Sequence, residues 1–107
     1  MTITVEPTNF NASSDLLDEV EKIFSQLNRY NDQITNIDIY LQSEPETDQK
    51  LKKVKAKILI PGHDLFAEEE AGDFISASQQ LHDKMKRLLR DQKEKDKANR
   101  NPRPDKP

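Results

Sequence analysis

Three groups of side chains could do chemistry: two histidines, a run of glutamates and a set of cations late in the chain. His63 lies beside Asp64 and could bind a metal or relay a proton, but a histidine next to a turn aspartate is usually just part of a polar turn. His82 has no partner motif around it. The glutamates at 68–70 cannot converge on a cation if they lie on a strand, because adjacent strand residues point to opposite faces.

Motifs for catalysis and cofactor binding are missing from the sequence. There is no cysteine, which excludes disulfides, a thiolate nucleophile and a cysteine-based zinc site. No phosphate-binding loop, dinucleotide fingerprint or nucleophile elbow is present. We therefore expect no enzymatic activity, no metal, no cofactor and no small-molecule substrate.

The cations of the last predicted helix are the better candidate for a functional surface. Lysines and arginines near a helix C-terminus can also just complement the helix dipole, and charge density alone does not separate the two interpretations. If these cations bind RNA, they do so through phosphates, reading shape and not sequence, because no aromatic side chain lies among them. Lys86, Arg90, Lys93 and Lys97 follow at spacings of four, three and four and form one basic ridge, with Lys84 and Arg87 in a second, shorter row.

Charge is distributed unevenly along the 107 residues, although the formal net charge is only −3. Residues 1–72 carry 7 Lys or Arg against 14 Asp or Glu, whereas residues 73–107 carry 10 against 6. The second part can therefore present a local positive field in an acidic protein. Lys53, Lys55 and Lys57 add cations on a predicted strand, on the face that we expect to lie opposite the helices.

Hydrophobic periodicity predicts the elements that must position these cations. Alternation indicates half-buried strands, and a helical period with Ser13 or Ser14 as N-cap and a break at residues 31–32 indicates the first helix. Pro61-Gly62 predicts a tight turn, and Asp73 is a suitable cap for the last helix. Strands are predicted at residues 2–5, 34–41, 51–60 and 65–71, helices at 15–30 and from 73 to about 96, and a loop at 43–49.

The order β-α-β-β-β-α predicts an α+β fold, a two-layer sandwich with a four-stranded sheet and both helices on one face. A crossover helix makes the first two strands a parallel pair, and the short links after them make the others antiparallel. Glu69 then shares the helix-facing side of the last strand with Leu65, Ala67 and Ala71, a position for which the alternation gives no reason.

One domain is expected over residues 1–96, followed by a disordered tail at 97–107 that contains three prolines and no core residue. The N-terminus has no basic region followed by an apolar run, and no apolar segment approaches the ~20 residues of a membrane span. We expect a cytoplasmic protein with no membrane partner.

Two sets of residues carry a resemblance to a known family. The first is Leu16, Val20, Phe24, Leu27, Tyr30 and the segment 32–41, and the second is ILIPG at 58–62, LFAE at 65–68, Asp73-Phe74, Ala77, Leu81, DKM at 83–85, Arg87, Leu89 and Lys93. Through them the chain resembles, across residues 1–95, the short ribosome hibernation-promoting factors and ribosome-associated inhibitors, also called the sigma-factor modulation protein family. The resemblance implies a fold similar to double-stranded RNA-binding domains. It also implies a non-enzymatic, cytoplasmic translation inhibitor that binds the small ribosomal subunit and its rRNA in the mRNA and tRNA channel, in stationary phase or stress.

The resemblance also implies which residues contact RNA. Lys84, Arg87 and Lys93 match the family's pattern DKL-x-RQL-x-KHK, while Arg90 and Lys86 join them by position on the ridge. The family has lysines on the outer face of its first helix. Here Ile23 and Gln26 take those places, with Lys22 and Arg29 nearby, and the family's small residue at position 69 is replaced by glutamate.

A different class of function stays open on the residues alone. The acidic start of the first helix, residues 15–21, repels RNA but could dock a basic protein, and an exposed sheet edge could accept a strand. The alternative is therefore a regulatory module that acts through protein–protein interaction.

Overall fold

The structure is a computed structural model that describes residues 1–43 and 51–100, with side chains described as far as Asp91. Its elements run in the predicted order. They are β1 (Thr2–Pro7), α1 (Ser14–Ser25), the 3₁₀ helix η1 (Gln26–Arg29), β2 (Asn36–Ser43), β3 (Lys52–Ile60), β4 (His63–Ala71) and α2 (Phe74–Arg100).

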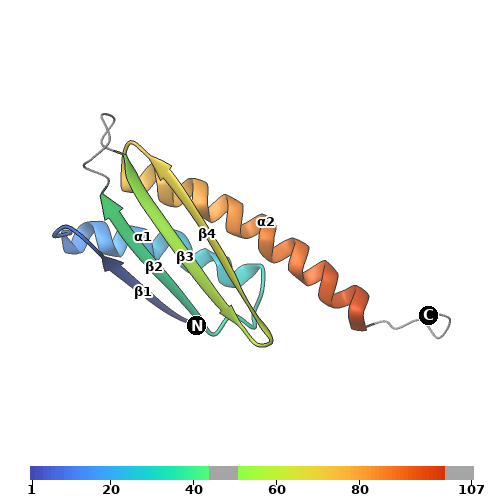
Figure 1. The fold of residues 1–107 in the computed structure, drawn as a ribbon. Coiled ribbons are helices and arrows are strands. Elements are labelled where there is room, and N and C mark those ends of the chain that lie inside the picture. Colours follow the sequence, from blue (N-terminus) through green and yellow to red (C-terminus); the bar gives the residue numbers. More distant parts are fainter. Residues whose placement is uncertain (44–50, 101–107) are drawn as a thin grey trace.

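The four strands form one sheet in the order β1-β2-β3-β4. β1 and β2 are parallel, whereas β2, β3 and β4 pair antiparallel. Both helices cover the same face of the sheet, and the C-terminal part of α2 extends past the sheet (Figure 1). The two-layer α+β fold predicted from the sequence is confirmed.

The core lies between the sheet and the helices. Strands β2 and β3 alternate between buried and half-buried residues, because alternate side chains point toward the helices. The helices contribute one apolar stripe each, as the helical period predicts. Buried residues are Val20, Phe24, Leu27, Ile34, Ile37, Ile39, Leu41, Val54, Ala56, Ile58, Ile60, Phe74, Ala77, Ser78, Leu81, Met85 and Leu89.

Side-chain caps begin both helices. The Ser13 hydroxyl accepts a hydrogen bond from the Leu16 amide at 3.1 Å, and an Asp73 carboxylate oxygen accepts one from the Ser76 amide at 2.7 Å. The Ser76 hydroxyl also donates to Asp73. These bonds from Ser76 lower the pKa of Asp73, because they favour the ionised carboxylate.

The β3–β4 hairpin determines where α2 begins. Pro61 and Gly62 form a two-residue turn, with Ile60 paired to His63 across it. Gly62 has a φ of 95°, a left-handed conformation that a side chain would strain. Proline followed by a glycine of positive φ is the type II pattern. The turn therefore fixes the register of the hairpin and, through it, the start of α2.

Several predicted boundaries were wrong. The α-helix α1 ends at Ser25, and the chain tightens into η1 up to Arg29, where the 3₁₀ turn keeps Leu27 buried. β4 begins at His63, two residues early, because the tight turn lets pairing start at once. α2 continues to Arg100, so residues 97–100 of the expected tail are helical. The rest of that tail, 101–107, and residues 44–49 of the predicted loop lie outside the described residues.

Candidate nucleic-acid interface

The outward face of α2 carries exposed cations from both predicted rows, Arg90 of the ridge and Arg87 of the second, shorter row. Leu81, Met85 and Leu89 bury one side of the helix against the sheet. Arg87 and Arg90, on the other side, are exposed. Within the part of the chain that the structure describes, neither arginine makes an ion pair with an acidic side chain. Their guanidinium groups are thus free to pair with an external anion.

A shallow hollow of about 570 Å³ lies along this face. Three cations contribute to its wall, so it can take anionic groups such as phosphates, which arginine binds well through paired N–H donors. The two acids in the wall reduce the positive field without cancelling it. The lining residues are Glu69, Gln80, Asp83, Lys86, Arg87 and Arg90.

Lys84 differs from these residues because its ammonium group already has partners inside the protein. Its Nζ lies 2.9 Å from a carboxylate oxygen of Glu69 and donates to the Glu68 carbonyl at 3.1 Å. Both partners belong to β4. The unexplained acid on the helix-facing side of that strand is therefore the counter-charge of Lys84.

Lys86 leans toward the end of η1. Its Nζ lies 5.2 Å from the centre of the Tyr30 ring, within cation–π range. The same ring meets His82 edge-on, with centroids 6.5 Å apart. Lys86 and Lys84 thus lie on opposite flanks of α2, with Arg87 and Arg90 on the outward side.

The remaining predicted RNA contacts are Lys22 in α1, Arg29 in η1 and Lys93 in α2. Lys22 lines a hollow with Met1 and Ile3, so it lies on the β1 side of α1, away from α2. Arg29 is exposed at the end of η1. Lys93 lies within α2, but its side chain is outside the described residues.

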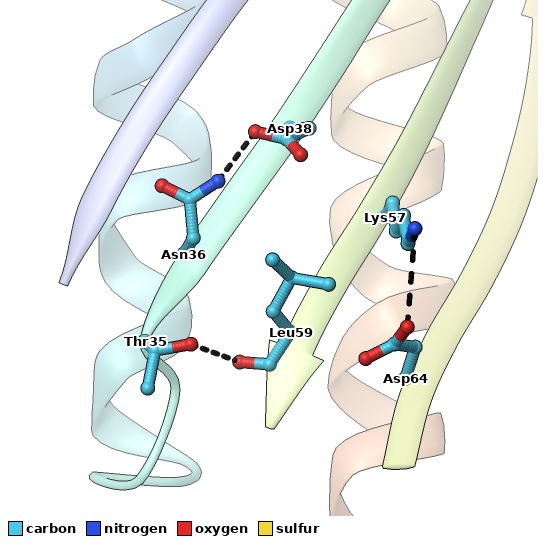
Figure 2. Close-up of polar contacts among 6 residues, drawn as sticks. All are labelled: Thr35, Asn36, Asp38, Lys57, Leu59 and Asp64. Carbon is cyan, nitrogen blue, oxygen red and sulfur yellow. Dashed lines mark hydrogen bonds and ion pairs between the residues drawn. The ribbon is translucent and has the colours of Figure 1, made fainter. Parts of the chain in front are cut away.

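Three lysines of β3, Lys53, Lys55 and Lys57, lie on the sheet face opposite the helices, as expected, and they have acidic neighbours. Lys53 Nζ is 4.0 Å from Glu70, and Lys55 is directly opposite Glu68 in the ladder. Lys57 Nζ is 3.9 Å from Asp64, and Figure 2 shows this pair on the face away from the helices.

Acidic residues also reach this face from β2. Asp38 is opposite Lys57 in the ladder and accepts a hydrogen bond from Asn36, also drawn in Figure 2. The sequence reasoning missed this neutralisation. For the acids of β4 a signal was present, because the two-residue turn at Pro61-Gly62 fixes the β3–β4 register and counting outward from it places Glu68 and Glu70 opposite Lys55 and Lys53.

The histidines form no metal site. His82 Nδ1 is 3.3 Å from an Asp83 carboxylate oxygen, and His63 is paired in the ladder with Ile60. Over residues 1–43 and 51–91, no three His, Asp or Glu side chains are placed to hold a metal ion. In the same described part, no helix is long and apolar enough to cross a membrane.

Comparison with known proteins places this chain in a family. Residues 3–97 match the model of the family described as Sigma 54 modulation protein / S30EA ribosomal protein. A ribosome hibernation promoting factor of Azotobacter vinelandii is 31% identical over 96 residues, covering 89% of this chain and 85% of that protein. One of Acinetobacter guillouiae is 27% identical over 95 residues, covering 83% and 84%.

Solved structures share the fold. A ribosomal subunit interface protein from Coxiella burnetii superposes with a TM-score of 0.76 at 25% identity, covering 87% of this chain and 98% of that one. The N-terminal domain of Thermus thermophilus Protein Y gives a TM-score of 0.73 at 23% identity, covering 84% and 97%. The chain belongs to the Sigma 54 modulation protein / S30EA ribosomal protein family, which indicates a non-enzymatic ribosome hibernation or subunit-interface protein.

Proposed function

We propose that this protein binds the small ribosomal subunit in the cytoplasm, mainly through the outward face of α2, and silences translation by occupying the mRNA and tRNA channel in stationary phase or under stress. The observation that carries the proposal is the pair of exposed arginines, Arg87 and Arg90, which have no acidic partner within the described residues. Lys86 lines the same hollow as the two arginines, and Lys93 stays a predicted contact from the sequence.

The chemistry of the surface determines how rRNA would be recognised. Guanidinium groups on a helix ridge pair with phosphates of a folded RNA and select its shape, because they do not reach base edges in a deep, narrow major groove. The outward side of α2 carries no aromatic residue between Gln79 and Asp91, so base stacking contributes little. Binding should therefore depend strongly on salt.

Co-sedimentation of the full chain with purified small subunits tests the proposal. Each phosphate contact contributes about −0.9 to the slope of log affinity against log salt, so three contacts predict a loss of roughly 40-fold between 50 and 200 mM salt. Large subunits serve as the control and should bind far less. Absence of co-sedimentation with small subunits at 50 mM salt would remove the proposal.

A second measurement tests the place of binding. If the protein occupies the decoding channel, small subunits preloaded with mRNA and a P-site tRNA should bind it at least about tenfold more weakly, because the ligands exclude each other. Equal binding to empty and preloaded subunits would move the contact elsewhere on the subunit.

A further inference from the structure

Lys84 and Glu69 connect α2 to the outer strand of the sheet. Glu69 lies on the helix-facing side of β4, in register with the buried Val54. Its carboxylate is 2.9 Å from Lys84 Nζ, and the two side chains are only 27% and 39% exposed. The pair is therefore partly shielded from water and salt, unlike the charges on the outward side of α2.

The second bond of Lys84 ties the helix to the backbone. β4 is an edge strand, and its free side offers carbonyl groups that another strand could pair with. Lys84 donates to one of these, the carbonyl of Glu68, at 3.1 Å. An ammonium group has three protons, and Lys84 directs two of them at β4.

A phosphate that takes the third proton of Lys84 lies beside the Glu69 carboxylate, and one that takes either of the other two protons displaces a partner on β4. A phosphodiester carries one negative charge, as Glu69 does, so exchanging the two gives the ammonium group no additional charge. Displacing the Glu68 carbonyl would break that bond and leave the Glu69 carboxylate beside the incoming phosphate. Arg87, one turn further along α2, can take a phosphate without any such loss.

We propose that Lys84 is a structural clamp between α2 and β4, not an RNA contact, and that Glu69 limits the affinity for RNA by holding this charge. The inference rests on the proposed function and reassigns the role that the family pattern gives to Lys84. Arg87 and Arg90 then carry the phosphate contacts, and removing the charge of Glu69 makes one more cation available.

Binding to purified small subunits in a salt series tests this, using variants that change one charge each. Lys84→Gln should alter affinity less than twofold, whereas Arg87→Gln should weaken it about tenfold and flatten the salt slope by about 0.9. Glu69→Gln should tighten binding about three- to tenfold and steepen the slope. Glu70→Gln, a neighbouring β4 residue on the opposite sheet face, has the same charge change and should stay within twofold.

The double variant Glu69→Gln/Lys84→Gln completes a double-mutant cycle. It should not show the higher affinity of Glu69→Gln, because that increase depends on the charge of Lys84. If Lys84→Gln alone weakens binding and flattens the slope as Arg87→Gln does, Lys84 contacts RNA and the proposal is overturned. It also falls if Glu70→Gln tightens binding as much as Glu69→Gln, since net charge alone would then explain the gain.

Thermal unfolding tests the clamp without RNA. Lys84→Gln should lower the midpoint by about 2–5 °C and Arg87→Gln by less than 1 °C, as expected for losing one partly buried ion pair. Equal midpoints for both variants would overturn the clamp. Failure of the wild-type chain to bind subunits would instead remove the proposed function, and the thermal comparison would still decide the role of Lys84.

Discussion

Two surfaces in the described part of this protein carry rows of cations, and they differ in whether acidic side chains lie beside those cations. On the open face of the sheet, Lys53 and Lys57 approach acidic side chains of β4 within 4.0 Å. On the outward side of α2, Arg87 and Arg90 have no such partner among the described residues. Counting cations does not distinguish these surfaces. The position of the acids does.

The difference follows from backbone geometry. Directly opposed residues of an antiparallel pair lie close together, so Glu70 and Glu68 of β4 neighbour Lys53 and Lys55 of β3, and Lys57 reaches Asp64 diagonally. On a helix, only residues three or four apart are neighbours. Asp83 and Asp91 have that spacing from Arg87, yet Asp83 approaches His82 instead. Among the described residues, the outward arginines therefore have no acidic side chain within ion-pair distance.

The largest effect should come from removing two charges on each surface in turn. Arg87→Gln/Arg90→Gln should weaken binding to small subunits about 100-fold at 0.1 M salt, because each lost phosphate contact costs roughly tenfold. Lys55→Gln/Lys57→Gln makes the same change in net charge and should stay within threefold. Both are measured by co-sedimentation, with circular dichroism to verify folding.

Equal losses in these two variants would break the comparison. Such a result would mean that net charge governs association and that the pairing of the β3 lysines does not matter. A loss confined to the sheet variant would place the interface on the open sheet face.

Smaller losses of affinity for small subunits should show where the RNA-binding surface ends. Lys22 lies near β1, so Lys22→Gln should change affinity less than threefold. Arg29, at the end of η1, precedes Tyr30, whose ring contacts Lys86. Arg29→Gln should therefore lower the affinity for small subunits somewhat more than Lys22→Gln does. A tenfold loss in Lys22→Gln would extend the contact around α1 and so enlarge the basic surface beyond α2.

The smallest effect should be on stability alone. Hydrogen bonds from Ser76 hold the pKa of Asp73 below its ordinary value of 3.8. The ionised carboxylate therefore contributes stability that is fully present above about pH 5 and is lost as the pH falls through the lower folded pKa. Asp73→Ala should lower the thermal midpoint at pH 7, and the difference from wild type should shrink below pH 4.

Asp73→Asn is the matched control, since asparagine also caps helices but does not titrate. Its midpoint should stay near wild type at pH 7 and lack this acid-dependent component. Neither change should alter subunit binding at pH 7, because the cap lies at the far end of α2 from the arginines. If Asp73→Ala binds small subunits more weakly although it is fully folded, the position of α2 also determines the affinity, and not only its charge.

Much of the fold could be predicted because local patterns and global structure agree here. Alternation in β2 and β3, the helical stripe of α2 and the Pro61-Gly62 turn each specify one arrangement. The end of α1 could not be placed, since the change to a 3₁₀ turn at Gln26 depends on burying Leu27. The site was predicted as a set of cations, but not as a division between paired and unpaired ones.

The sequence by itself determined the order of elements, the two-layer fold and the basic stripe of α2, because these depend on period, turn chemistry and charge along one chain. Only the tertiary structure decided which cations are free. Lys84 and Glu69 are 15 positions apart and meet only because α2 folds back along β4. Electrostatic pairing depends on distance in space, so the cations of α2 acquire their different roles only after the chain has folded.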